Sequence, residues 1–299
     1  MTGVIEQTRG FEVIGTGSYL PERVMTNAEL ERMVDTSDAW IRARTGIGER
    51  RIAAPDEATS DLALVAAERA LQAAGILPDA VDLIIVATAT PDMPFPPTAC
   101  LVQHRIGASA AVAFDLSAVC SGFLYGFSTA VGLILSGIYR TALVIGAEVF
   151  SRIVDWEDRS TCVLFGDGAG AVVLQAADRK QVFASYLGSD GALSELLMVP
   201  AGGSRMPARK RTVDERLHYL KMGNGKEVFK RAVHLMTESC LKVLDEANLQ
   251  PEDIDFMIPH QANIRIIRAL SQKLSLSEEK VVANVHKYGN TSGASIPIA

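Results

Sequence analysis

The chain has 299 residues, of which 48% are hydrophobic and 21% are charged, so it can bury a large core and is not a disordered protein. Its formal net charge of -6 argues against a general nucleic-acid binder, and its apolar runs are too short to cross a membrane. Its four cysteines lack the C-x-x-C spacing of a metal site, and residues 1–10 lack an apolar signal core, so we expect a cytoplasmic protein.

The first fifty residues indicate a strand followed by helical segments. Residues 11–20 read as a strand that ends in a glycine-rich turn, and residues 26–34 read as a helix with Asn27 as a possible N-cap. Trp40 and Arg44 follow, four positions apart and therefore on one face of a helix. Such a pair serves either as a structural cation–π contact or as a site for a flat ligand that carries phosphate.

Strands and helices alternate through the next part of the chain. A helix over residues 59–74 has a clear start and is closed by Gly75. The run from 81 to 90 is continuously apolar and rich in β-branched residues, as in a strand covered on both faces. Further elements are expected as a helix over 98–106 and strands over 112–114, 141–146 and 169–174. This alternation predicts an α/β fold with a mostly parallel or mixed sheet.

A cysteine stands at the junction between the strand at 112–114 and the apolar helix after it. Cys120 precedes Gly122 and Gly126, which keep one face of that helix thin enough for close packing. Free N–H groups and the positive end of the helix dipole favour the thiolate at such a position. The competing interpretation is a small buried hydrophobic residue, which is the commoner fate of a free cysteine.

The chain contains an internal repeat. Residues 71–86 resemble residues 244–259 in their order of helix, turn, proline and strand. The match then continues at a spacing of 170 residues, which places Cys120 opposite Asn290. Two matches in the same order indicate a duplicated half, and we expect the halves to be 1–176 and 177–299.

Equivalent strand ends of two related halves should meet in one crevice. Cys120 would come from the first half, with His260 and Asn290 from the second, each at a strand-to-helix junction. A lone histidine is more often structural, but three polar groups at related positions favour a reactive site. Strands matching the last two of the first half would fall near 312–344. We therefore expect the second half to be incomplete, and we expect the chain to be poorly stable or inactive if it truly consists of these 299 residues.

Five stretches resemble the β-ketoacyl-acyl-carrier-protein synthase III family of the thiolase superfamily. They are Thr36–Ile47, Asp115–Phe123, Trp156–Ala171, Pro259–Asn263 and Tyr288–Ser292. The resemblance runs from Val13 to Ala299, departs in a slightly expanded segment at 222–229, and implies that the chain ends before the family's usual C-terminus. It implies thiolase-like duplicated halves in a five-layer αβαβα arrangement, with the second half incomplete.

The resemblance also implies the chemistry, namely an acyltransferase that initiates type II fatty-acid synthesis. Cys120 would take an acyl group from acyl-CoA as a thioester, a role that suits a nucleophile that is also a good leaving group. His260 and Asn290 would assist decarboxylation of malonyl-acyl-carrier-protein, and the resulting carbanion would attack the thioester. No metal or organic cofactor is expected, since acyl-CoA is a substrate.

Binding residues follow from the same resemblance. Those expected to hold the adenine and phosphates of CoA are Trp40, Arg44 and Arg159, and those lining the channel are Thr36, Gly225, Phe229 and Asn263. Phe95 would cross a homodimer interface into the partner's acyl pocket. The patch expected to dock the acidic acyl carrier protein consists of Lys230, Arg265 and Lys273, a local cationic face on an acidic protein.

Three other classes of protein are compatible with parts of this sequence pattern. A papain-like hydrolase shares the order Cys, His, Asn, but the local Cys-Trp signature and a preceding glutamine are absent. A non-catalytic partner subunit would have lost the cysteine or the histidine. A related condensing enzyme of secondary metabolism remains open at this stage, as does the length and branching of the primer.

Overall fold

The computed structural model describes residues 2–4, 10–178, 181 and 183–299, so most of the N-terminal stretch without a signal core lies outside the described residues. The strands are β1 (Thr2–Val4), β2 (Gly10–Tyr19), β3 (Arg23–Thr26), β4 (Glu49–Ile52), β5 (Leu83–Ala87), β6 (Val112–Leu116), β7 (Thr141–Glu148), β8 (Gly168–Ala177), β9 (Ala184–Tyr186), β10 (Leu197–Met198) and β11 (Lys221–Met222). The helices are α1 (Asn27–Leu30), α2 (Asp38–Thr45), α3 (Thr59–Ala74), α4 (Thr98–Ile106), α5 (Gly122–Leu135), α6 (Arg159–Cys162), α7 (Lys210–Asp214), α8 (Gly225–Ala247), α9 (Ile264–Lys273), α10 (Val285–Tyr288) and α11 (Ser295–Ile298).

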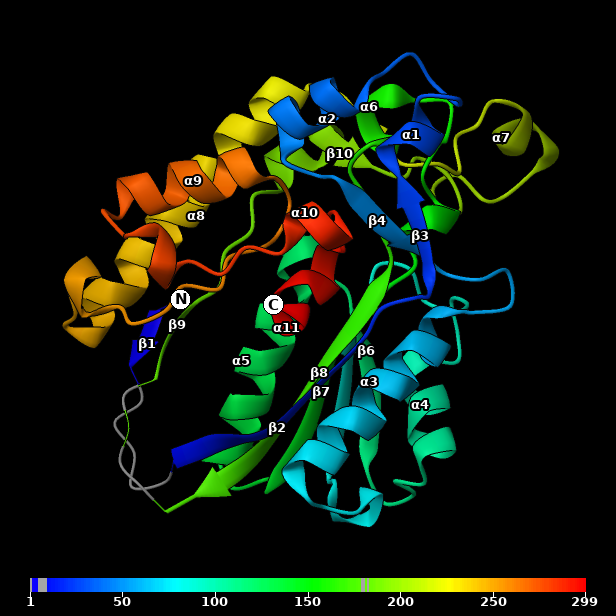
Figure 1. Cartoon of the computed structure of the whole chain (residues 1–299). Helices are drawn as coiled ribbons and strands as arrows, with labels where there is room; N and C mark the ends of the chain where they lie inside the picture. Colours follow the sequence, from blue (N-terminus) through cyan, green and yellow to red (C-terminus); the bar gives the residue numbers. More distant parts are fainter. Residues whose placement is uncertain (1, 5–9, 179–180, 182) are drawn as a thin grey trace.

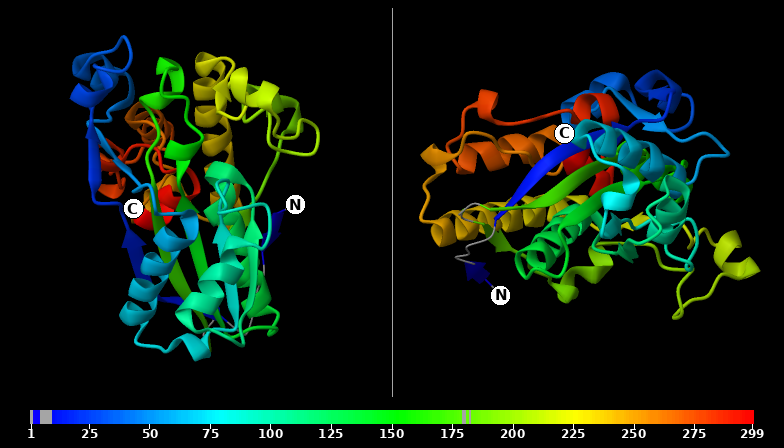
Figure 2. Two further views of the ribbon diagram at one scale, coloured as in Figure 1. Left: turned by 90° about the vertical axis from the view of Figure 1, so that its right-hand side faces the viewer. Right: turned by 90° about the horizontal axis from the view of Figure 1, so that it is seen from below.

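A five-stranded mixed sheet forms the centre of the molecule, in the order β2-β8-β7-β5-β6 (Figure 1). β7, β5 and β6 run parallel, whereas β8 is antiparallel to both β7 and β2. Every residue of β5 and β7 is buried, because α3 and α4 cover one face of the sheet and α5 covers the other (Figure 2). The expectation of a covered mixed α/β sheet is confirmed. None of the described helices is both long enough and apolar enough to cross a bilayer.

The same succession of elements occurs twice along the chain. Helices α3 and α8 both end at a left-handed residue, Gly75 (φ 67°) and Asn248 (φ 54°). Each helix end is followed by a 3-10 turn that begins at a proline, Pro78 in the first copy and Pro251 in the second. The sequence repeat therefore corresponds to a repeat in the backbone.

The backbone corrects one detail of that repeat. The turns concerned are η2 (Val119–Ser121), directly before α5, and η7 (Ser292–Ala294), directly before α11. Val119 and Ser292 open them with nearly identical left-handed φ angles of 47° and 48°. The equivalent of Cys120 is therefore Gly293, and its assignment opposite Asn290 was wrong, because Gly293 follows Ala283 by ten residues whereas Cys120 follows Ala113 by seven.

The second half carries less sheet than the first. The segments that should correspond to β5 and β6 form one isolated parallel bridge, between Met257 and Val281. Met257 packs there with Leu270 and Leu274 of the α9 region in a small core cluster. Two short segments without further strands beside them are too few for a stable ladder. Among the described residues, the second sheet of the five-layer arrangement thus consists of the single bridge between Met257 and Val281.

The helix expected over residues 26–34 is shorter, and its cap is different. α1 ends at Leu30, and Thr26 is the N-cap: its hydroxyl accepts the N–H of Glu29 at 3.4 Å, and Glu29 accepts the N–H of Thr26 at 3.1 Å. Asn27 is instead buried and donates to Asp38 at 2.8 Å. Pairing of β3 with β4 through Thr26 fixes where the helix can start.

Candidate active site

Cys120 lies in the turn η2, between β6 and α5, and is half-buried. Its Sγ is 3.6 Å from Oγ of Ser292. Burial raises the pKa of the Cys120 thiol to about 11; the Ser292 hydrogen bond opposes this rise, and the charge of Glu148 adds to it. The expectation that the helix start favours the thiolate is wrong for the resting thiol, because the loss of solvation is the larger effect.

The glycines after the cysteine bring α5 close to the sheet, as predicted. A Cβ atom on Gly122 would lie 3.2 Å from Cβ of Ala87, and one on Gly126 would lie 3.2 Å from Cγ1 of Val144. Contacts this short leave almost no room for a larger side chain. The first turns of α5, and Cys120 directly before them, are therefore fixed against the end of β5 and the middle of β7.

Asn290 is 6% exposed and is held by its own backbone. Its N–H donates to the carbonyl of Leu164 at 2.9 Å, and its carbonyl accepts the N–H of Gly166 at 3.0 Å. The side-chain oxygen accepts the N–H of Ser292 at 2.8 Å. The oxygen is thus committed, which leaves the amide NH₂ group as a donor.

His260 stands in the loop between Met257 and α9. Its Nδ1 is 2.7 Å from Oγ of Ser295, and the N–H of Gln261 donates to the same oxygen at 3.2 Å. Burial lowers the pKa of His260 to about 4. The imidazole is therefore neutral at physiological pH.

The three predicted polar residues meet at one short segment of the chain. Residues 290–295 contain Asn290, contact Cys120 through Ser292, and contact His260 through Ser295. Sequence reasoning missed both serines, although they lie among the small residues that follow Tyr288. It also missed Glu148, whose signal is a single acid at the end of an otherwise apolar strand.

Trp40 is 37% exposed on α2, and a cation does lie over its ring. That cation is Arg159, with its guanidinium carbon 5.1 Å from the ring centre. Arg159 also donates to the carbonyl of Asp35 at 2.7 Å. The structural pair suggested for Trp40 and Arg44 is therefore not formed; the Arg44 side chain is exposed, and its carbonyl accepts from Asn263 at 3.1 Å.

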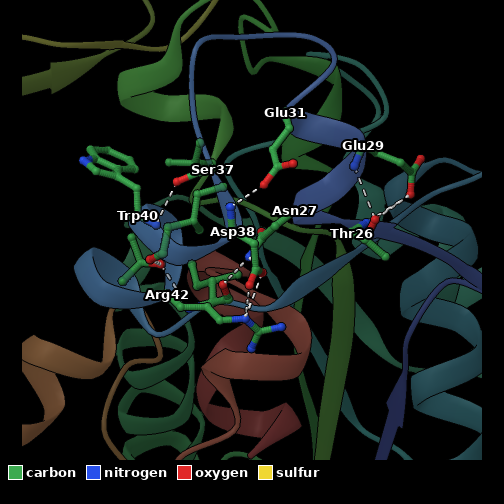
Figure 3. Close-up of polar contacts among 12 residues, drawn as sticks. Thr26, Asn27, Glu29, Glu31, Ser37, Asp38, Trp40 and Arg42 are labelled. Carbon is green, nitrogen blue, oxygen red and sulfur yellow. Dashed lines mark hydrogen bonds and ion pairs between the residues drawn. The ribbon is translucent and has the colours of Figure 1, made fainter.

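A hydrogen-bond network fixes the helix that carries Trp40 (Figure 3). Ser37 caps α2 by accepting the N–H of Trp40 at 3.1 Å. Asp38 accepts from Asn27 and from Arg42, each at 2.8 Å. The position of α2 is thus set by contacts within the protein.

The remaining predicted channel residues lie around the same helix. Thr36 precedes α2, and its hydroxyl oxygen is buried without a hydrogen-bond partner among the described residues. Asn263 caps α9 by accepting the N–H of Arg265 at 2.8 Å. Gly225 opens α8, and Phe229 on that helix lies 5.3 Å from the guanidinium carbon of Arg265.

The predicted docking cations are exposed on two neighbouring helices, Lys230 on α8 and both Arg265 and Lys273 on α9 (Figure 1). Phe95, expected at a subunit interface, has 82% of its surface exposed. In the part of the chain that the structure describes, no group of three His, Cys, Asp or Glu side chains could hold a metal ion.

Comparison with known proteins gives one consistent family. The model for 3-oxoacyl-[acyl-carrier-protein (ACP)] synthase III matches residues 114–191, and the model for its C-terminal part matches residues 244–299. A β-ketoacyl-[acyl-carrier-protein] synthase III from Caldanaerobacter subterraneus subsp. tengcongensis is 56% identical over 96% of this chain and 87% of that protein. The chain belongs to the β-ketoacyl-[acyl-carrier-protein] synthase III family. The family resemblance seen in the sequence is confirmed.

Solved structures of this family share the fold. The 3-oxoacyl-[acyl-carrier-protein] synthase III of Aquifex aeolicus VF5 is 51% identical, with a TM-score of 0.88 over 97% of this chain and 89% of that one. The priming β-ketosynthase of the R1128 polyketide pathway is 36% identical, with a TM-score of 0.90 over 99% of this chain and 87% of that one. The thiolase-like fold is therefore confirmed. The lower identity to the polyketide enzyme does not favour the secondary-metabolism alternative.

Proposed function

We propose that Cys120, His260 and Asn290 are the catalytic residues of this β-ketoacyl-[acyl-carrier-protein] synthase III, a condensing acyltransferase that initiates fatty-acid synthesis. The observation that carries this proposal is that all three residues meet at residues 290–295. Asn290 belongs to this segment. Sγ of Cys120 is 3.6 Å from Oγ of Ser292, and Nδ1 of His260 is 2.7 Å from Oγ of Ser295. The neutral histidine and the amide fit a role as hydrogen-bond donors. The thiol fits a role as acyl carrier.

In the first half-reaction, the sulfur of Cys120 attacks the thioester carbon of an acyl-CoA, and CoA leaves as its thiol. The product is an acyl thioester on Cys120. Since the start of α5 is fixed against β5 and β7, the nucleophile does not need to be reoriented for attack. An acyl thioester at this position is then available to a second substrate.

In the second half-reaction, His260 and Asn290 stabilise charge on malonyl-acyl-carrier-protein as CO₂ leaves. Here the Ser295 hydroxyl is taken as the donor to Nδ1 of His260, 2.7 Å away, which places the imidazole proton on Nε2. Nε2–H and the Asn290 amide then donate to the enolate oxygen of the malonyl thioester, an interaction worth about 3–4 kcal/mol per donor. The carbanion attacks the acyl thioester and yields the β-ketoacyl product.

The CoA end is assigned to the surface around α2. Trp40 and Arg159 offer a flat face and a cation, which suit adenine and phosphate respectively. The unpartnered Thr36 hydroxyl supplies a polar contact. The other residues assigned to CoA and its pantetheine arm are Arg44, Gly225, Phe229 and Asn263.

The exposed cations Lys230, Arg265 and Lys273 are assigned to docking of the acidic carrier protein. Lys273→Glu is expected to raise KM for malonyl-acyl-carrier-protein about five- to tenfold, since a like charge would then face the partner. Acylation by acyl-CoA should not change, because that step does not involve the carrier protein. Steady-state kinetics against Arg205→Glu, a charge reversal in the loop before α7, make the comparison. An equal effect of both variants would remove Lys273 from the docking surface.

The same proposal includes four broader assignments: a homodimer, a reaction without a cofactor, a cytoplasmic location and two thiolase-like halves. Exposure of Phe95 is consistent with burial in a homodimer, where it would enter the partner's acyl pocket. The reaction written above uses no metal or organic cofactor, and a cytoplasmic location suits its substrates. The halves 1–176 and 177–299 are taken as the two thiolase-like units, with the division at the end of β8.

A product assay tests the function as a whole. The protein is incubated with a panel of straight and branched acyl-CoAs and with malonyl-acyl-carrier-protein, and the carrier-bound products are weighed. We expect β-ketoacyl-carrier products that are two carbons longer than each accepted primer, with release of CO₂. Hydrolysis of acyl-CoA without a lengthened product would contradict a condensing enzyme.

A further inference from the structure

A buried acid lies next to the proposed nucleophile, and the mechanism above does not use it. Glu148 ends β7 and is 0% exposed. Its carboxylate accepts from the N–H of Ala89 at 3.1 Å and from the hydroxyls of Thr90 at 2.6 Å and Thr88 at 3.3 Å. All these donors are neutral. Burial raises the pKa of Glu148 to about 7, although the hydrogen bonds oppose that rise.

Ser292 connects this acid to Cys120. Its hydroxyl interacts with the Glu148 carboxylate, which lowers the pKa of that group, and the same hydroxyl lies 3.6 Å from the sulfur of Cys120. Ser292 is fully buried, and its N–H is fixed to Asn290 at 2.8 Å. A Cβ atom on the next residue, Gly293, would lie 3.4 Å from Oε1 of Glu148, so this turn is seated directly against the acid.

The direction of the Ser292 hydroxyl couples the two acids. An ionised carboxylate can only accept, so it takes the Ser292 proton and leaves Ser292 to accept from the Cys120 thiol. A thiolate likewise can only accept, and it gains the Ser292 proton only when Glu148 is protonated. One proton and one negative charge are therefore shared between Glu148 and Cys120.

Building on the function proposed above, we propose that Glu148 accepts the proton of Cys120 through Ser292 when the thiol attacks the acyl-CoA. The S–H bond breaks as its proton passes to Ser292 and the Ser292 proton passes to Glu148. The sulfur lone pair forms the new bond to the acyl carbon. The carbon–sulfur bond to CoA breaks, and the departing sulfur recovers the proton from Glu148 along the same path, so no proton is gained or lost.

The other ionisable groups near Glu148 have hydrogen-bond partners of their own. Asp167 adjoins Gly168, the strand partner of Glu148, but its carboxylate accepts the N–H groups of Ala53 and Ser151. Burial raises the pKa of Asp167, while the charge of Arg152 lowers it. His260, reached through Ser295 of α11, has its pKa lowered by burial to about 4. Among the described residues, no hydrogen bond joins Asp167 or His260 to Glu148 or to Cys120, so neither group lies on the path through Ser292.

The test is the pH profile of Cys120 alkylation by iodoacetamide, followed by the mass of its peptide, in the wild type and in Glu148→Gln. In the wild type the rate should rise about tenfold per pH unit up to about pH 7 and then level off, because ionised Glu148 opposes the thiolate. In Glu148→Gln the rise should continue toward about pH 9 and exceed the wild-type rate there about tenfold or more. Parallel profiles would overturn the proposal.

Two controls make the result specific. Ser292→Ala should lower the plateau, since the thiolate loses its donor; a plateau at wild-type height would show that the proton does not pass through Ser292. The alkylation of Cys100, measured in the same digests, should have the same pH profile in all variants, and a changed profile would attribute the effect to altered folding.

Because alkylation needs no acyl-CoA, it tests the proton coupling separately from acyl transfer. With acyl-CoA as the reagent, the same pair of profiles is expected for acylation, and parallel acylation profiles would overturn the role of Glu148 in that step.

Discussion

Cys120→Ser is expected to lower acyl transfer from acyl-CoA by about four orders of magnitude or more. Serine preserves the size of the side chain and its contact with Ser292, which lies 3.6 Å from the sulfur. An alcohol, however, is far less acidic than a thiol and a much weaker nucleophile, and the Glu148 carboxylate is too weak a base to ionise it. Single-turnover transfer of a radiolabelled acyl group to the protein measures the change.

Cys100→Ser is the matched control for this substitution. Cys100 is half-buried in α4, with its sulfur 3.6 Å from the carbonyl of Ala113, and it has no part in the proposed chemistry. Its variant should acylate at the wild-type rate. Full-rate acylation of Cys120→Ser, or loss of acylation in the control alone, would sink the assignment of the nucleophile.

His260→Ala is expected to separate the two half-reactions. Acylation by acyl-CoA should change little, whereas condensation with malonyl-acyl-carrier-protein should fall about 10²- to 10³-fold, the usual effect of removing one donor to a developing oxyanion. Because burial lowers the pKa of His260 to about 4, the loss should be nearly constant from about pH 6 to pH 8. Rates of CO₂ release and of acyl-enzyme formation, measured on the same preparation, give the comparison.

His286→Ala provides the control for the second half-reaction. His286 is exposed on α10, a few residues before Asn290, and has no contact with the proposed site. Its variant should release CO₂ at the wild-type rate. Undiminished condensation by His260→Ala would show that decarboxylation does not use the imidazole.

Elements with strong local signals were predictable from the sequence. The limits of α3 and α4 agree with the structure, because each helix combines apolar periodicity with a glycine stop, Gly75 and Gly107. The apolar run that contains β5 was recognisable because the strand is covered on both faces. The start of α1 was not, because its N-cap is fixed by pairing of β3 with β4, which is a tertiary contact.

The sequence nominates the residues of the candidate site but does not predict the contacts between them. Cys120, His260 and Asn290 stand in motifs with specific neighbours, so the sequence was sufficient to nominate them. Ser292 reaches Cys120 only because residues 172 positions apart meet in the fold. The direction of the shift in the pKa of Cys120 was predicted wrongly for the same reason. Burial raises this pKa, and burial depends on the packing of the whole molecule and not on the helix start alone.

The central claim is that the acyl group is carried on Cys120. The direct measurement is to incubate the protein with acyl-CoA alone, digest it, and find the acylated peptide by mass spectrometry. Malonyl-acyl-carrier-protein is then added to a second portion. Transfer through Cys120 predicts one acyl group on the peptide that contains Cys120, and its conversion to β-ketoacyl-acyl-carrier-protein in the second portion. An acyl group on another residue, or a condensed product formed while the acyl-Cys120 peptide persists unchanged, would contradict it.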